Sequence, residues 1–454
     1  MNTDLSVLDN LSADQRCSKK NNSLSQKYNW PLYAYRWRVV LISVILLTIL
    51  FPVVVYADQA IANFEGASQG DEVIVWGPYL TNTSHSSTII HWKTLEPSIG
   101  RVGFALSGIK APGISDQSVS EKNSSQFHEV QLNNLSPGQR YFYCIGNNSG
   151  NYSFRTLPLN GPFTFIVYGD TREQLPWWNQ STHHALVAAR IAKEPDCLFV
   201  VHTGDLVNDP ADEDEWGRFF EAAGPMLANT TFYPVPGNHE GDLLKYEEYF
   251  GASPWYNFTV ADSEFIILDS NTLTPVMDDQ QNRWINQSLS GPSNGRFIFL
   301  HHPMYTSEPN HWGGFQNIRE KWEQLFIEHN VLGVFSAHVH AYEHFYENGI
   351  HYFTIGTGGA PFYPLANQKP EGYRNSMENT LAYARVTVNA DGGSTLIEVI
   401  KVAGVHDGQI MVYPPGTIAE RIVISQSPEK KADKLTNSFS VIYSLFRSPL
   451  RFFR

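Results

Sequence analysis

The sequence predicts an α/β domain preceded by a smaller all-β domain. Short alternating or aromatic-rich runs, separated by turn residues, continue to about residue 157 and are typical of a β sandwich. After Leu157-Pro158, apolar runs of four to six residues alternate with helical patterns, as they do in α/β domains. The chain of 454 residues is long enough for two folded units with tails. Its composition, 42% hydrophobic and 17% charged, is that of a globular protein with a core.

The all-β domain is expected to span residues 70–157. Its runs read STIIHWKT, FHEVQL, RYFYCIG and NYSFRT, and clusters of Gly, Pro, Asn and Ser separate them. Regular short strands with this punctuation predict a sandwich of about 100 residues. The segment 135–138 (LSPG), followed by Tyr141, resembles the tyrosine corner of fibronectin type III domains. Trp92 is then expected in the core, and the motifs of this domain indicate no chemistry.

The α/β domain is expected to span residues 160–425. FTFIVY ends at Gly169-Asp170, CLFVV ends at the segment 202–205 (HTGD), and the helical pattern THHALVAARIAK lies between them. The later apolar runs FYPV, FIIL, FIFL, GVFS and HYFTI alternate with further helical patterns. This alternation predicts a sheet buried on both faces. Ligands of such sheets bind beyond the carboxyl ends of the strands.

Residues of metal-ligand type follow five of the predicted strands. In chain order the motifs are Gly169-Asp170-Thr171-Arg172, Gly204-Asp205-Leu206, Gly237-Asn238-His239-Glu240, His301-His302-Pro303 and Ala337-His338-Val339-His340. Each motif is weak by itself, since a Gly-Asp pair after a strand is usually a turn. Five such motifs at strand ends indicate a metal site. Their carboxylate, amide and imidazole groups suit ions such as iron, zinc and manganese.

The types of these residues suit phosphoryl transfer. Two metal ions about 3.5–4 Å apart can clamp both ends of an in-line phosphoryl displacement. Asp205 is the candidate for the carboxylate that bridges the two ions, and the neutral Asn238 limits the negative charge that faces an anionic substrate. His338 and His340 lie two residues apart, so on an extended segment they point the same way. The sequence therefore predicts a two-metal phosphoesterase site.

The ordered motifs resemble those of calcineurin-like metallophosphoesterases, and a sandwich followed by this domain resembles purple acid phosphatases. The resemblance covers about residues 70–425, and GNHE and HVHAYEH are its most specific parts. It implies a two-sheet sandwich flanked by helices and hydrolysis of phosphate esters by a hydroxide held between two ions. One implied ligand set, here called the Asp170 site, is Asp170, Asp205 and His340. The other, called the Asn238 site, is Asp205, Asn238, His301 and His338.

The resemblance also implies roles for residues outside the two ligand sets. His239 matches a substrate-contacting histidine and is a candidate general acid, and His311 is placed like a phosphate-contacting histidine. Purple acid phosphatases carry a tyrosine where this chain has Asn208, and many metallophosphoesterases carry a histidine where it has Arg172. The Asp170 site is therefore one ligand short, and Asn208, Asp209 or water is expected to fill the gap. Arg172 is interpreted either as a phosphate clamp or as an ordinary surface ion pair.

Acid phosphatase-like monoester hydrolysis is the expected function, with two alternatives. One is a phosphodiesterase of the same superfamily, because the motifs do not decide between monoesters and diesters. That choice depends on the loops at 305–314 and 358–372. The other is a catalytically degenerate extracytoplasmic protein that binds a partner through the sandwich. The net charge of −13 argues against nucleic-acid binding, which needs a basic face. The sequence does not predict an oligomeric state.

The two ends of the chain indicate export and contact with a membrane. Residues 39–56 form an 18-residue run without charge, long enough to cross a bilayer. The tail at 1–38 is predominantly basic, which keeps it cytoplasmic and sends the rest of the chain outward. The segment 39–57 is thus either a signal anchor or a cleaved signal peptide, and the protein is membrane-anchored or secreted. The basic, aromatic tail at 428–454 either lies on an anionic membrane surface or is disordered.

Overall fold

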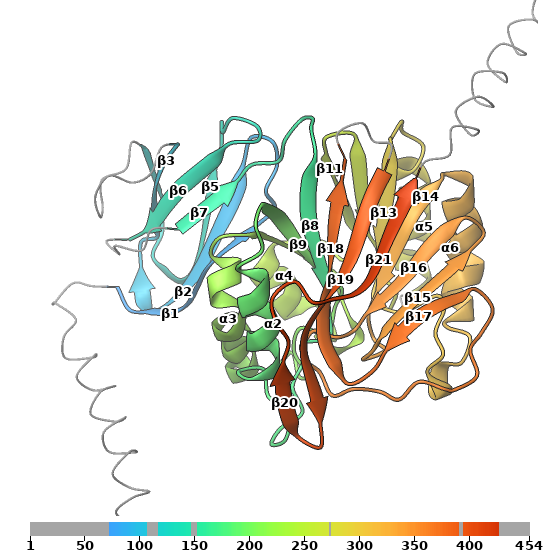
Figure 1. Ribbon diagram of the computed structural model, residues 1–454. Helices are drawn as coiled ribbons and strands as arrows, with labels where there is room; N and C mark the ends of the chain where they lie inside the picture. The colour runs from blue at the N-terminus through green and yellow to red at the C-terminus, as the bar shows by residue number, and fades with distance from the viewer. Residues whose placement is uncertain (1–71, 107–116, 147–151, 272–273, 390–393, 426–454) are drawn as a thin grey trace, which may run out of the picture. The chain divides into compact units, whose positions relative to one another are not determined.

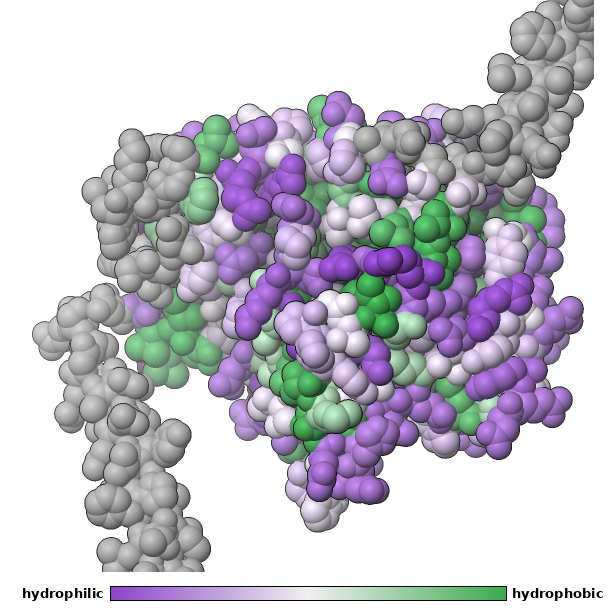
Figure 2. All heavy atoms as spheres, in the orientation of Figure 1, coloured by the Kyte–Doolittle hydropathy of each residue, from purple (hydrophilic) through white to green (hydrophobic). Residues whose placement is uncertain are grey.

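The computed structural model describes residues 72–106, 117–146, 152–271, 274–389 and 394–425, which form four β-sheets and several helices (Figure 1). The expected tails and the apolar segment, at 1–38, 39–57 and 428–454, lie outside the described residues. Among the described residues, no helix combines the length and the apolar character needed to span a bilayer. The face displayed in Figure 2 mixes hydrophilic and apolar residues.

The first two sheets are antiparallel and form the expected all-β sandwich. One has the order β1-β2-β5 and the other β4-β3-β6-β7. The bounds are β1 (Ile74–Thr81), β2 (Thr88–Ser98), β3 (Arg101–Ala105), β4 (Gln117–Ser120), β5 (Ser125–Leu132), β6 (Arg140–Ile145) and β7 (Tyr152–Arg155). Trp92 is fully buried between the sheets, as predicted. The hydroxyl of Tyr141 accepts a hydrogen bond from the backbone N–H of Ser136 at 2.8 Å, as in a tyrosine corner.

The other two sheets each have seven strands and form the α/β domain. The first has the order β10-β9-β8-β18-β19-β20, with β21 also paired to β19, and the second has the order β11-β12-β13-β14-β16-β15-β17. The first sheet contains β8 (Phe163–Tyr168), β9 (Cys197–His202), β10 (Thr231–Pro234), β18 (Thr380–Val388), β19 (Ser394–His406), β20 (Gln409–Val412) and β21 (Ile418–Ser425). The second contains β11 (Tyr256–Val260), β12 (Ser263–Ile267), β13 (Gly295–Phe299), β14 (Val331–Ser336), β15 (Tyr342–Glu347), β16 (Ile350–Ile355) and β17 (Tyr373–Met377).

The helices cover the outer faces of the two seven-stranded sheets. Figure 1 shows α2 and α3 on the side of the first sheet and α5 and α6 on the side of the second. The helical segments are α2 (His183–Ile191), α3 (Glu213–Leu227), η1 (Asn238–Glu240), α4 (Leu244–Phe250), α5 (Pro275–Ser288), η2 (Pro309–His311) and α6 (Gln316–Glu328). The predicted two-sheet sandwich flanked by helices is thereby confirmed.

Side-chain alternation along the strands builds two separate cores around the second sheet. In β13, Phe297 and Phe299 belong to the core between the two sheets, whereas Ile298 belongs to the core beneath α5 and α6. Successive side chains of a strand point to opposite faces, so one apolar run serves both cores. In the central core, Phe165 of β8 lies stacked on Phe199 of β9, with ring centroids 5.1 Å apart. These packed layers fix where the strands end.

The small sandwich shares part of its core with the α/β domain. Trp76 of β1 stacks on Phe220 of α3, with centroids 4.2 Å apart and rings 12° from parallel. The hydroxyl of Tyr143 donates a buried hydrogen bond of 2.7 Å to the carbonyl of Ala228, just beyond α3. The two regions accordingly form one compact unit. The precise boundaries 70–157 and 160–425 stay predictions.

Candidate metal centre

The metal-ligand motifs follow the carboxyl ends of strands from both large sheets. Asp170 follows β8, Asp205 follows β9 and Asn238 begins η1 after β10, and these three neighbouring strands are parallel. His301 follows β13, and His338 and His340 follow the neighbouring parallel strand β14. Because parallel strands end at the same edge of a sheet, each sheet brings its motifs together. The packing of the two sheets then joins the two groups.

The two aspartates sit in sharp turns that hold each other. Asp170 and Asp205 both have a φ of 56°, in the left-handed region that costs about 1–3 kcal/mol for such residues. The backbone N–H of Asp170 donates to the carbonyl of Gly204 at 3.0 Å, and that of Thr171 donates to the carbonyl of Asp205 at 3.0 Å. Gly204 must lack a side chain, because a Cβ there would lie 2.7 Å from Nδ1 of His301. The strain therefore serves to bring ligands close.

The Asp170 site contains an unpaired buried carboxylate. Asp170 is fully buried, and neither of its side-chain oxygens has a hydrogen-bond partner. Its Oδ1 lies 4.0 Å from Nε2 of His340 and 4.0 Å from Nδ1 of His301. Oxygen and nitrogen atoms of Asp170, Asp205 and His301 lie within 4.8 Å of one another. A buried carboxylate without a partner is costly, and a bound cation would compensate it, so these residues fit a metal ion.

The Asn238 site brings an amide oxygen and two imidazole nitrogens together. Oδ1 of Asn238 lies 2.8 Å from Nδ1 of His338 and 3.0 Å from Nε2 of His301. The two nitrogens are 3.2 Å apart, and Nε2 of His301 is also 3.3 Å from Oδ1 of Asp205. All four residues of the predicted set thus direct ligand atoms towards one place.

Backbone carbonyls orient two of the histidines for metal binding. Nδ1 of His301 donates to the carbonyl of Thr203 at 2.9 Å, and Nδ1 of His340 donates to the carbonyl of Pro361 at 2.5 Å. A carbonyl can only accept, so in each neutral ring Nε2 carries the free lone pair. Ligating histidines are commonly fixed in this way by a hydrogen bond from the other nitrogen.

Burial and mutual attraction shift the pKa values of these groups. Burial raises the pKa of Asp170 well above its usual range. Burial also raises the pKa of Asp205, but the neighbouring His301 outweighs it and holds that pKa well below its usual range. Burial lowers the pKa of His301, but Asp205 outweighs it and raises the pKa to about 9. Burial lowers the pKa of His338 to about 2 and that of His340 to about 3, so both are neutral and able to bind a metal.

Glu240, for which the sequence motifs predicted no role, joins the turn that carries Asp205 to the turn that carries Asn238. Its fully buried carboxylate accepts hydrogen bonds from the backbone N–H groups of Gly237 at 2.6 Å, Asp205 at 3.0 Å and Leu206 at 2.8 Å. Burial, followed by repulsion from Asp205, raises its pKa to about 7. Its spacing in the sequence could have predicted this role. A glutamate three residues after the residue that precedes a helix commonly accepts the backbone N–H of that residue, here Gly237.

The predicted catalytic histidines lie beside the ligand cluster. Nε2 of His239 is 3.9 Å from Oδ2 of Asp205, and its Nδ1 donates to the backbone carbonyl of Asn208 at 2.8 Å. The ring of His311 lies 5.2 Å from that of His338, and its Nδ1 is 2.8 Å from Oε2 of Glu308. Both side chains are partly exposed, so a substrate can reach them.

Arg172 is buried among these groups, so its interpretation as a surface ion pair is wrong. Its residue exposure is 8%, and Nε lies 3.7 Å from Oδ2 of Asp205. One guanidinium nitrogen donates to the amide oxygen of Asn208 at 3.2 Å, and the other donates to the hydroxyl of Tyr363 at 3.3 Å. The Tyr363 ring stacks on that of His340, with centroids 4.1 Å apart. The sequence predicted that the loop 358–372 affects substrate choice. Only the folded shape of that loop shows that Tyr363 lies against Arg172 and His340.

His302, for which the sequence motifs predicted no role, also lies in the cluster of ligand-type side chains. One of its ring nitrogens lies within 4.8 Å of a ring nitrogen of His301 and of one of His338. Its Nδ1 is 2.9 Å from the hydroxyl of Ser270, which also accepts the backbone N–H of His302. Burial lowers its pKa to about 3, so the ring is neutral.

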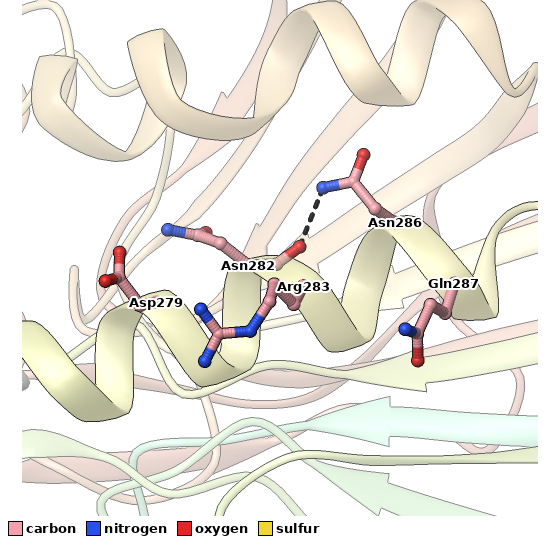
Figure 3. Close-up of a pocket in the computed structure, with 5 residues that line it drawn as sticks. All are labelled: Asp279, Asn282, Arg283, Asn286 and Gln287. Carbon is pink, nitrogen blue, oxygen red and sulfur yellow. Dashed lines mark hydrogen bonds between the residues drawn. The ribbon is translucent and has the colours of Figure 1, made fainter.

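A separate pocket lies along α5, away from these motifs in the chain. Figure 3 shows that it is lined by polar side chains of this one helix, with the amide of Asn286 donating to the carbonyl of Asn282. Its two charged residues, Asp279 and Arg283, do not gather into a ligand cluster. The strand-end cluster therefore remains the candidate site.

Comparisons with known proteins found a family match for each of the two regions. Residues 163–342 match the calcineurin-like phosphoesterase family, and residues 76–156 match the purple acid phosphatase N-terminal domain. Purple acid phosphatase 22 of Arabidopsis thaliana is 28% identical over 266 residues, covering 52% of this chain and 59% of that protein. Fe(3+)-Zn(2+) purple acid phosphatase 12 of Arabidopsis thaliana is 24% identical, covering 58% of this chain and 64% of that protein.

Phosphoenolpyruvate phosphatase of Allium cepa is 24% identical, covering 63% of this chain and 65% of that protein. The chain thus spans less than two thirds of each of these relatives. The structure of a purple acid phosphatase from yellow lupin (Lupinus luteus) seeds aligns with a TM-score of 0.64 and 17% identity, covering 79% of this chain and 75% of that one. That likeness supports the fold.

Replacing Glu240 by glutamine tests whether it organises the ligands. A glutamine side chain has one acceptor oxygen and an NH2 group, so at least one of the three N–H donors loses its acceptor. We expect the affinity for Zn²⁺ to fall about 10- to 100-fold, as measured by equilibrium dialysis with elemental analysis. Glu221→Gln, at an exposed position of α3, is the matched control. Unchanged zinc affinity in a folded Glu240→Gln protein would show that the three hydrogen bonds to Glu240 are not needed for metal binding.

Proposed function

We propose that this chain, which joins a calcineurin-like phosphoesterase domain to a purple acid phosphatase N-terminal domain, is a metal-dependent hydrolase of phosphate monoesters. The observation that carries the proposal is the convergence of six ligand-type side chains from five strand ends. These are Asp170, Asp205, Asn238, His301, His338 and His340. The unpaired carboxylate of Asp170 adds support, because it fits a cation.

We propose that the Asp170 site and the Asn238 site each hold one ion and share Asp205. The ions come from iron, zinc and manganese, in keeping with the donor set and with a relative named for Fe(3+) and Zn(2+). When bound, such ions neutralise phosphoryl charge and supply a nucleophilic oxygen at neutral pH. Asn208 remains a proposed ligand of the Asp170 site. To bind the ion, its amide oxygen has to give up the hydrogen bond that it accepts from Arg172.

We propose His239 as the proton donor to the leaving oxygen. Its Nδ1 hydrogen is engaged by the carbonyl of Asn208, so the proton that protonates the ring resides on Nε2. Nε2 is also the nitrogen near Asp205, on the side of the ligands. Transfer of that proton leaves a neutral ring whose tautomer the Asn208 carbonyl already favours. His311 and Arg172 are proposed to contact the phosphoryl oxygens, with Glu308 orienting His311.

Monoesters are favoured over diesters because the named relatives are phosphatases. The competing possibility is a degenerate protein that keeps the fold and binds a partner through its sandwich. The distinction depends on whether the cluster holds metal and turns over a substrate.

Replacing Asp205 by alanine should remove both metal and activity. Asp205 belongs to both proposed ion sites, so we expect turnover of an aryl phosphate to fall about a thousandfold or more. Metal content measured on the same samples should fall with it. Asp279→Ala, an exposed position on α5, should retain both properties. A wild-type protein without stoichiometric metal and as inert as the Asp205→Ala variant would support the degenerate binding protein instead.

Replacing His239 by glutamine should slow poor leaving groups most. General acids contribute about 10²- to 10⁴-fold, and an alkyl phosphate needs the proton more than an activated aryl phosphate does. We expect kcat for the alkyl ester to fall towards that range and kcat for the aryl ester to fall less. His406→Gln, at the exposed end of β19, should leave both rates intact. Equal losses for leaving groups of different pKa would remove His239 as the general acid.

We infer from the sequence that the body of the protein works outside the cytoplasm, tethered by the uncleaved apolar segment 39–56. In cells, the full chain should stay in the membrane fraction after carbonate extraction, with its α/β domain accessible to protease from the outer side. Deleting residues 39–56 should leave the protein in the cytosol. A mature N-terminus at Asp58, read by mass spectrometry, would instead establish a cleaved signal peptide.

A further inference from the structure

Arg172 brings a fixed positive charge into the metal centre. The side chain is nine-tenths buried, and its Nε has no hydrogen-bond partner. Two neutral oxygen atoms, from Asn208 and Tyr363, accept its outer N–H groups and hold the guanidinium in place. Neither partner carries a negative charge that would cancel that of Arg172. The nearest carboxylate is Asp205, at 3.7 Å from Nε.

The charge of Arg172 acts on all three residues of the Asp170 site. It faces Asp205 directly, and Tyr363, which accepts from it, stacks on His340. Burial and then the charge of Arg172 lower the pKa of His340. Burial raises the pKa of Asp170, whereas His301 and, more weakly, Arg172 lower it. A cation bound at the Asp170 site would therefore meet a guanidinium among its own ligands.

At the Asn238 site, Arg172 reaches only the shared ligand Asp205. Among the described residues, neither Asn238 nor His338 forms a hydrogen bond or ion pair with a lysine or arginine. The other ligands of this site are the amide of Asn238 and the imidazoles of His301 and His338, whose ligand atoms lie within 3.2 Å of one another. The two neighbouring sites thus differ in the charge that surrounds them.

We propose that Arg172 makes the two metal sites unequal, so that the Asn238 site binds its ion tightly and the Asp170 site binds weakly and exchanges readily. The inference rests on the metal-dependent function proposed above. Like charges a few ångströms apart in a partly buried site repel by enough to change affinity by at least about tenfold. The Asp170 site also offers fewer protein ligands, three against four.

Three substitutions at Arg172 separate its charge from its shape. Arg172→Lys keeps the positive charge, Arg172→Gln removes it, and Arg172→His removes it and adds a neutral nitrogen ligand. Each metal-depleted, full-length variant is titrated with Zn²⁺ by equilibrium dialysis, and bound zinc is counted by elemental analysis. The Asp205→Ala protein gives the background from zinc bound elsewhere. Arg101→Gln, an exposed position in β3, is the matched control.

The expected wild-type curve has two steps of one zinc each, at least about tenfold apart in affinity. Arg172→Lys and Arg101→Gln should keep that gap. Arg172→Gln should tighten the second step by about tenfold, and Arg172→His should tighten it further because it adds a ligand. The affinity of the first step should change little in all four variants.

Two zinc ions that bind the wild-type protein with equal affinity would overturn the inference. So would a second step that is unchanged in both Arg172→Gln and Arg172→His. Turnover of an aryl phosphate, measured separately at saturating zinc, tests the proposed function. Two unequal steps in an inert protein would reject the hydrolase and keep the inference, whereas equal steps in an active protein would do the reverse.

Discussion

The metal centre depends on the carboxylate of Glu240, which ties the turn after β9 to the turn after β10. Three backbone N–H groups donate to this one side chain, from Gly237, Asp205 and Leu206. Buried backbone donors need partners, and a charged acceptor satisfies all three without a further chain segment. Asp205 is thereby held through its own backbone N–H, and Asn238 through that of its neighbour Gly237, so neither side chain is needed for this support. Ligands of two neighbouring ions, which is the role proposed for this pair, need support of this kind.

The small sandwich also supports residues of the centre, through helix α3. Trp76 of β1 stacks on Phe220 of α3, so the sandwich backs the helix whose first turn contains Glu215. The buried carboxylate of Glu215 accepts the backbone N–H groups of Asn208, at 2.5 Å, and Asp209, at 3.0 Å. Asn208 in turn holds His239 and Arg172. The small sandwich thus helps to position His239, the proposed proton donor, and the guanidinium of Arg172.

Charge in the centre is divided unevenly. The carboxylates of Asp170 and Asp205 lie beside two groups that can carry positive charge, Arg172 and His301. Asp170 keeps two unpaired oxygens in spite of these neighbours, which is why a cation fits there. The same guanidinium that offsets the carboxylates opposes that cation. The centre therefore balances attraction for metal at Asp170 against repulsion at Arg172.

The sequence by itself determined which residues end the strands and, through them, most of the site. Apolar runs that stop at Asp170, Asp205 and His301 were readable because strand periodicity and ligand type are local properties. The position of Trp92 in the sandwich core was readable for the same reason. Only the tertiary structure decided the partners of these residues. Arg172 and Tyr363 are 191 positions apart, and no local pattern predicts that their side chains meet. Burial of Arg172, and with it the unequal surroundings of the two ion sites, follows from that packing.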